Sequence, residues 1–296
     1  KKVKNIKKYN KMNHLISNKM RGILVLVISL NFCYSASSQE IKGEIIGSVS
    51  GVFSTLDYSL NGASLRNGKG GQVGVHYGYH LSENYSLQLG LEFQSVSSSS
   101  RYEVIRGSYN ATDSEGEDFE FRYRGTNFQE QQKAQFVSIP LVVQYETSGV
   151  SRFYIAVGGK VALPIDTYYE TDIKTLNTSG FYRQYNVELF DPEFAGFGTY
   201  RNINVNDQDL ELKTAFSATL ELGIKQMLSS NNSIYIGLFF DYGINDLYDG
   251  EEFEDLVNYS NDIPSEFTYN TILGTSNASE VKLNAYGVKL KYSLGI

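Results

Sequence analysis

The segment Tyr85 to Gln94, YSLQLGLEFQ, alternates strictly between two kinds of residue. Its odd-numbered positions are apolar, and its even-numbered positions are polar or Gly. Successive side chains of a β-strand point to opposite faces, so the segment is predicted to be a strand that separates an apolar medium from a polar one. A period of two excludes an amphipathic helix.

The same alternation recurs in seven further segments of the chain: 41–53, 72–81, 137–145, 153–163, 216–228, 234–242 and 286–296. Short connections at 82–84, 147–149 and 229–232 alternate with long ones, among them 96–134, 166–211 and 245–280. The pattern predicts an all-β fold, an eight-stranded antiparallel up-and-down transmembrane β-barrel with four long extracellular loops and three short periplasmic turns. Pro140 lacks a backbone N–H, so we expect a bulge or an unpaired carbonyl there.

The choice of the inner face rests on residue size. The polar face carries many small residues, such as Gly74, Gly90 and Gly158, and the lumen of an eight-stranded barrel is only just wide enough for side chains to fill. The apolar face is bulky and has aromatic residues near the strand ends, such as Tyr85 and Phe93, as in interfacial girdles. These features favour a polar lumen and a lipid-facing exterior; a soluble ligand-binding barrel is the alternative.

Residues 1–38 are predicted to be a basic leader and a secretory signal peptide, and residues 39–296 one outer-membrane barrel domain. The apolar run Gly22 to Asn31 follows basic sequence and precedes the small residues Ala36 to Ser38, which are typical of a cleavage site. The single cysteine, Cys33, lies within the predicted signal. Disulfides are therefore not expected in the mature chain.

The mature chain is predicted to be strongly acidic. Eight of the 26 Lys and Arg residues lie in residues 1–38, which leaves 18 cations against 33 carboxylates and a net charge of −15. This balance argues against nucleic acid as a partner. We expect a monomer in the lipid of the cell outer membrane, with another envelope or secretion protein as the candidate partner and no cofactor or metal.

Charged residues on the polar face are expected near mid-height of the lumen: Glu92, Lys160, Glu221, Asp241 and Lys289. Opposite charges at one level of a narrow lumen should pair, since an unpaired buried charge is costly. A structural ion-pair network is the favoured interpretation, and a gated ion path the alternative. His76 and His80 share this face and are expected to fill the lumen rather than to catalyse.

Two long segments carry distinctive side chains. The segment 166–211 is rich in aromatics, and we predict either a self-packed cap on the barrel mouth or a contact surface for protein or glycan; the candidate contact residues are Tyr182, Tyr185, Phe190, Phe194, Phe197 and Tyr200. The segment 245–280 holds nine acidic residues and no Lys or Arg. A solvated acidic loop is the favoured interpretation, because the segment lacks EF-hand spacing; calcium binding by oxygen ligands of residues 249–252 is the alternative.

One resemblance to a known family covers the region from Ile41 to Ile296. The segments Phe136 to Tyr145, FVSIPLVVQY, and Phe153 to Gly159, FYIAVGG, resemble the PorT-like outer-membrane β-barrel proteins of the Bacteroidota. The resemblance implies an outer-membrane location, and one member of that group serves in protein secretion. It supplies no functional motif that could be transferred to particular residues.

The function expected from these features is that of a non-enzymatic outer-membrane barrel that presents extracellular loops for interaction or envelope stability. It could be an accessory of a secretion or surface complex. A small-solute or ion channel is the alternative, and an outer-membrane enzyme the third hypothesis. No catalytic residue is predicted.

Overall fold

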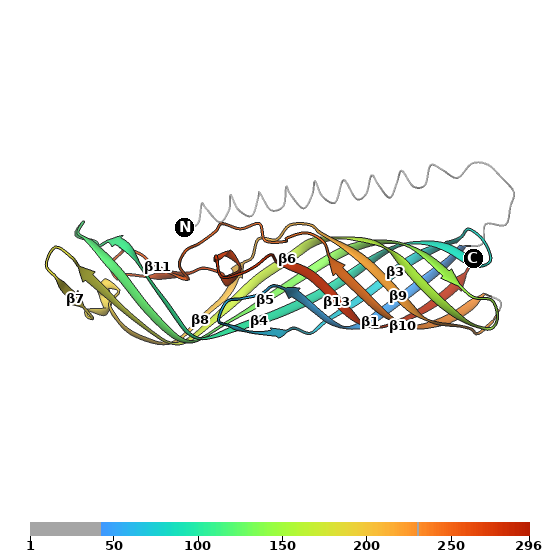
Figure 1. The fold of residues 1–296 in the computed structure, drawn as a ribbon, viewed down its shortest axis with the longest axis horizontal. Helices are drawn as coiled ribbons and strands as arrows, with labels where there is room; N and C mark the ends of the chain where they lie inside the picture. The colour runs from blue at the N-terminus through green and yellow to red at the C-terminus, as the bar shows by residue number, and fades with distance from the viewer. Residues whose placement is uncertain (1–42, 230) are drawn as a thin grey trace. The chain divides into compact units, whose positions relative to one another are not determined.

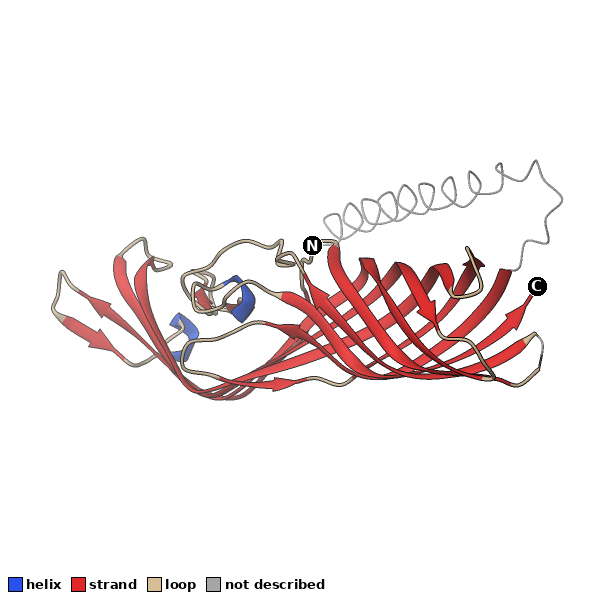
Figure 2. Cartoon of the chain, turned by 45° about the vertical axis from the view of Figure 1, so that its right-hand side comes forward, coloured by secondary structure: helices blue, strands red, loops and turns tan. Residues whose placement is uncertain are grey.

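A computed structural model describes residues 43–229 and 231–296. The predicted signal peptide lies outside the described residues. Figure 2 shows that strands make up most of the described chain, and their pairings are antiparallel. The all-β prediction is therefore confirmed. Within the described ranges, no helix has the length and apolar character needed to cross a membrane.

Antiparallel pairings run in a circuit around the strands that we call the barrel. In chain order these strands are β1 (Gly43–Asp57), β3 (Gly70–His80), β4 (Tyr85–Thr112), β5 (Asp118–Glu146), β6 (Ser151–Tyr182), β9 (Ala215–Met227), β10 (Asn232–Gly243) and β13 (Lys282–Gly295). Each pairs with the next, and β13 pairs with β1. Figure 1 shows these strands side by side. We call the end with the short connections the turn end and the other the mouth end.

The barrel is apolar outside and polar inside. Large apolar residues alternate along every barrel strand and are exposed, for example Leu89 at 37%, Phe153 at 69% and Leu238 at 58%. Between them lie buried polar residues such as Gln88 and Ser217. A protein surrounded by water usually has the reverse arrangement, because exposed apolar surface and buried polar groups both cost free energy.

The expected bulge does not occur at Pro140. The pairing of β4 with β5 skips Gly90 and Leu91, opposite Pro140 and Ile139, but keeps one register on both sides. Pro140 is aligned with Lys160 on β6. The register instead shifts between Gln135 and Phe136. The missing proline N–H is thus accommodated by a gap in one ladder.

Two segments that we predicted to be loops are strands. β4 and β5 stay paired as far as Thr112 and Asp118, and β6 continues to Tyr182, pairing with β7 (Val187–Leu189) and β8 (Gly198–Asp209). The prediction of long loops at 96–134 and 166–211 was therefore wrong. Beyond Gln94 the outer face becomes polar, so the apolar alternation ends although the pairing does not.

The long strands bend at one row of residues. Pairing skips Glu103, Asn127, Lys174 and Asn202 while the register on either side is unchanged, and Asn127 and Asn202 have positive φ of 51° and 52°. Asn tolerates this left-handed conformation, and an unpaired residue re-aims the side chains that follow it. In Figure 1 the strands curve near the label β8. We call residues 104–126 and 175–201, beyond this row, the arm.

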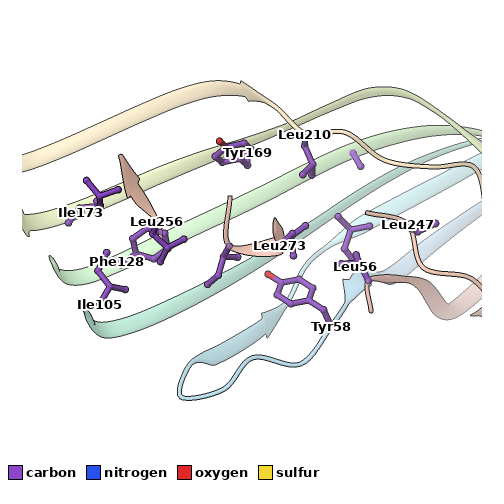
Figure 3. Packing of buried hydrophobic residues seen from close by; sticks show 14 of the residues in the cluster. Leu56, Tyr58, Ile105, Phe128, Tyr169, Ile173, Leu210, Leu247, Leu256 and Leu273 are labelled. Atoms are coloured by element: carbon purple, nitrogen blue, oxygen red, sulfur yellow. The ribbon is translucent and has the colours of Figure 1, made fainter. Parts of the chain in front are cut away.

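Residues 245–281, which we call the cap, pack at the mouth end. They include β11 (Val257–Tyr259), which pairs with β12 (Phe267–Tyr269), and the 3-10 turn η3 (Ile272–Gly274). Figure 3 shows Leu247, Leu256 and Leu273 of the cap among buried side chains from the long strands. The remaining elements are the short strand β2 (Ser64–Asn67) and the 3-10 turn η2 (Glu193–Ala195).

The cap corrects the prediction of a solvated acidic loop. Its carboxylates Glu251, Glu252 and Glu254 are exposed, but its apolar residues Leu256 and Ile272 are buried. The acidic composition therefore describes one side of the segment only.

Candidate functional site

Lys160 on β6 lies between two carboxylates in the lumen. Its Nζ is 2.7 Å from Glu92 Oε2 and 2.6 Å from Asp241 Oδ2. The three side chains are at most 3% exposed. The Thr219 hydroxyl donates a hydrogen bond of 2.5 Å to Asp241 Oδ1. These three charged groups are thus buried and paired, and buried charges are tolerated only when they are paired and hydrogen-bonded.

Lys289 on β13 continues this network across the lumen. Its Nζ is 3.1 Å from Glu92 Oε1 and 3.7 Å from Glu221 Oε2. Lys291 lies 2.5 Å from Glu221 Oε1, and the Tyr154 hydroxyl donates to the same carboxylate at 2.6 Å. The structure therefore places the predicted residues in one chain of contacts, in the order Asp241, Lys160, Glu92, Lys289 and Glu221.

A second group of charges, which the sequence analysis did not assign, lies nearer the turn end. Lys225 Nζ is 3.1 Å from Glu146 Oε2 and 3.5 Å from Glu44 Oε2. Arg152 binds Glu146 at 2.5 Å, and the Tyr235 hydroxyl donates to Glu44 at 3.0 Å. All these residues occupy polar-face positions, so the alternation contained the signal that would have identified them.

The charges of the two groups balance among the described residues. Five cations, Lys160, Lys225, Lys289, Lys291 and Arg152, contact five carboxylates, Glu44, Glu92, Glu146, Glu221 and Asp241. A neutral network attracts neither sign of ion over the other. The two groups fill part of the lumen with paired charges.

His76 does not have the geometry of a hydrolytic triad. Ser48 Oγ lies 2.9 Å from His76 Nε2, and Glu92 Oε1 lies 3.6 Å from the same nitrogen. In a Ser-His-acid triad the acid binds the other ring nitrogen, but here Nδ1 faces Gly90, where a Cβ would be 2.1 Å away. His80 lies 3.9 Å from Glu44. Both histidines therefore lie among lumen-filling contacts.

Glu130 on β5 anchors the cap. Its side chain is fully buried and accepts hydrogen bonds from Thr271 Oγ1 at 2.8 Å, Ile272 N at 2.9 Å and Gln132 Nε2 at 2.7 Å. Burial raises the pKa of Glu130 to about 7, although these hydrogen bonds act to lower it. The cap is thus tied to the barrel through a group that titrates near neutrality.

The structure divides the predicted aromatic contact surface. Phe197 and Tyr182 are 1% and 7% exposed and belong to the arm's core, and Tyr200 is half-buried against Phe267 at a ring distance of 5.1 Å. The exposed members are Tyr185 at 60%, Phe190 at 62% and Phe194 at 58%. Ring contacts with the cap bury Phe197 and Tyr200, whereas Tyr182 packs against other aromatic rings of the arm.

The exposed aromatics belong to an apolar patch at the end of the arm, the tip patch: Tyr185, Val187, Leu189, Phe190, Phe194 and Ile263. The Phe194 carbonyl accepts a hydrogen bond from Ser265 N at 2.8 Å, which brings the segment with Ile263 to the same place. The sequence pattern did not indicate Val187, Leu189 and Ile263 as contact residues. A group of exposed apolar residues outside the barrel is typical of a contact surface.

Metal binding has no support in the described ranges. No group of three or more His, Cys, Asp or Glu residues there could hold a metal ion. In the acidic segment, Asp249 lies 3.7 Å from Lys213 Nζ, a surface ion pair.

Solved structures with a similar fold are small outer-membrane and surface proteins. No family model and no curated protein matches this chain. Neisserial surface protein A is 8% identical, with 85% of this chain and 96% of that chain covered and a TM-score of 0.35. OprG from Pseudomonas aeruginosa is 12% identical, covering 86% and 97%, with a TM-score of 0.34. E. coli outer membrane protein W is 9% identical, covering 85% and 98%, with a TM-score of 0.31.

Proposed function

We propose that the chain is an eight-stranded up-and-down barrel of the cell outer membrane, with the turn end in the periplasm and the cap and arm outside the cell. The observation that carries this proposal is the inverted burial of the barrel, with exposed Leu89 and Leu238 and buried Glu92 and Lys160. Lipid is the solvent that favours such a surface. The sequence resemblance to PorT-like proteins of the Bacteroidota is part of the same proposal.

The proposed role is a non-enzymatic one, in which the arm presents the tip patch to another protein of the envelope or of a secretion complex. The aromatic side chains Tyr185, Phe190 and Phe194 are large, exposed and close in sequence, and aromatic residues dominate the energetics of protein contacts. The chain itself is proposed to be a monomer, because its barrel pairings leave no open barrel edge.

Location and partner can be tested separately. The protein should sediment with the outer membrane on a density gradient and resist extraction by alkaline carbonate. Affinity purification from native outer membrane should then recover a stoichiometric protein partner. A Tyr185→Ser, Phe190→Ser, Phe194→Ser variant should lose that partner and remain in the membrane.

A matched variant controls for the loss of exposed apolar surface. Ile244→Ser changes a residue of similar exposure, 61%, at the end of β10 and outside the tip patch, and should keep the partner. Recovery of the same partner by the triple variant would rule out the tip patch. Release of the protein by carbonate would rule out the membrane location.

A further inference from the structure

Two arginines face each other on the outer side of the arm. Arg106 of β4 and Arg124 of β5 are register partners in the antiparallel ladder, and both side chains are exposed. Directly opposed residues have Cα atoms about 4.5 to 5.5 Å apart, and like charges at this separation destabilise a sheet. Stabilisation of the fold therefore does not explain why two arginines occupy these positions.

A third arginine belongs to the same face. The row of Arg106 and Arg124 continues into β6 and β8 at Asn177 and Thr199, and Arg201 lies two residues along β8 from Thr199. Residues two apart on a strand point to the same side. Arg201 is also exposed. We call Arg106, Arg124 and Arg201 the arginine face.

These three arginines lack counter-charges. In the described ranges, none of their side chains makes a hydrogen bond or an ion pair. The neighbouring Arg122 differs, since it binds Glu120 at 2.9 Å and Glu188 at 3.2 Å. The carboxylates of Glu120 and Glu188 on this side of the arm are thus paired with Arg122 and not with the arginine face.

Uncharged polar side chains lie between the arginines of this face. Thr126 and Thr175 occupy the row of Arg201, and the Thr199 hydroxyl donates to Asn177 Oδ1 at 2.8 Å. Hydroxyl and amide groups both donate and accept hydrogen bonds, which suits them to sugar hydroxyls. The antiparallel ladder sets these groups in rows across neighbouring strands, which suits an extended chain.

We propose that the arginine face binds an anionic polysaccharide that carries sulfate or phosphate groups. Guanidinium groups bind such oxyanions through two parallel hydrogen bonds, and a bound anion would relieve the repulsion between Arg106 and Arg124. Nucleic acid fits less well, because the hydroxyl and amide side chains beside the arginines suit the hydroxyl groups of a sugar chain. This site is independent of the tip patch.

The test uses the full-length protein refolded into phosphatidylcholine vesicles, with dextran sulfate as the probe and neutral dextran as its control. The variant Arg106→Gln, Arg124→Gln, Arg201→Gln should bind dextran sulfate about tenfold or more weakly, since each charge-assisted hydrogen bond is lost. The parent's affinity should fall as salt rises, and the salt dependence should be shallower in the variant.

A second triple variant removes the same charge from paired cations. Lys133→Gln, Lys213→Gln, Lys282→Gln replaces side chains bound to Glu170, Asp249 and Glu280 away from the arginine face, and should bind nearly as the parent does. Equal losses of affinity in both variants would show that binding depends on overall charge, and would overturn the proposal. The proposal would also be overturned if the parent protein did not bind dextran sulfate, or if it bound duplex DNA equally well.

Two further measurements complete the test. Purified lipopolysaccharide in place of dextran sulfate distinguishes phosphate groups of the cell's own surface from sulfated glycans of the surroundings; preference for either supports an anionic-glycan site. Relief of the repulsion between Arg106 and Arg124 should also make the arm of the first variant more stable than that of the second. Misfolding of the first variant in place of this gain would contradict the argument from repulsion.

Discussion

The carboxylate of Glu130 accepts a hydrogen bond of 2.9 Å from the backbone N–H of Ile272, a residue 142 positions away in the sequence. This contact joins β5 to the cap at a fully buried point. When the cap opens, Glu130 meets water and its pKa returns toward the ordinary value of 4.5, whereas the closed cap holds that pKa at about 7. Opening of the cap is therefore linked to pH.

Cap stability should decrease as pH rises. A carboxyl whose pKa is raised in the closed state contributes stability that is fully present below pH 4.5 and is lost as pH rises through 7. The difference corresponds to about 3 kcal/mol of opening free energy. Hydrogen exchange at Leu273 to Thr275, corrected for intrinsic rates, should report this decrease. Glu130→Gln should remove it.

A surface carboxylate provides the control for this experiment. Glu170 is partly exposed and lies 2.9 Å from Lys133, away from η3. Glu170→Gln should keep the pH dependence of cap opening. A Glu130→Gln variant with the parent's pH profile would show that another group titrates.

A charged residue on the outer face of the barrel should destabilise the protein in lipid. Leu89 is 37% exposed and lies midway along the apolar part of β4, residues 85–94, and Leu89→Arg should reduce the unfolding free energy in lipid vesicles by about 2 to 4 kcal/mol. Leu189 in β7 is similarly exposed at 39% but lies on the arm, so Leu189→Arg should change stability by less than about 0.5 kcal/mol. Equal effects would place Leu89 outside lipid.

Removal of Lys160 should be much more damaging than removal of Lys133. Lys160→Ala leaves Glu92 and Asp241 without their shared cation in a buried site, at a cost of roughly 3 to 5 kcal/mol. Lys133→Ala breaks a partly exposed pair with Glu170, which is worth about 1 kcal/mol or less. Denaturant titration in vesicles compares the two. Similar losses would mean that the lumen is hydrated.

The paired lumen should conduct little. An eight-stranded barrel leaves room mainly for side chains, and here paired charges such as Lys289 and Glu92 occupy it. In a planar bilayer the unmodified protein should show little steady conductance, and Lys160→Ala should open a cation-selective leak. Large, stable conductance from the unmodified protein would favour the channel hypothesis.

The arm should unfold independently of the barrel. Phe121 is fully buried and its ring lies 5.3 Å from Tyr259 and 5.9 Å from Phe267, so Phe121→Ala should cost about 3 to 5 kcal/mol. Trypsin should then cleave the arm of the variant and spare the barrel. Phe190→Ala, at an exposed site, should leave the arm resistant. Loss of the whole barrel in Phe121→Ala would contradict separate stability.

The sequence by itself determined which side chains of the barrel strands point outward. The face to which a strand residue points is a local property, because successive side chains alternate between the two faces. Leu89 and Glu92 were therefore assigned to opposite faces without knowledge of any partner strand, and the structure places them there. Their approximate heights followed from counting residues from the turns, which brought Glu92 and Lys160 to a common level.

Tertiary structure decided where each strand ends, which charges pair and which aromatics are exposed. Beyond Gln94 the outer face of β4 becomes polar, so the apolar alternation no longer marks the strand, and pairing with β5 keeps the segment extended. Phe190 and Phe197 are the same residue type, yet one is 62% exposed and the other 1%. The difference arises from contacts with the distant cap, such as the ring contact of Phe197 with Tyr259. Burial of this kind depends on residues far away in the chain, so it cannot be predicted from a local sequence pattern.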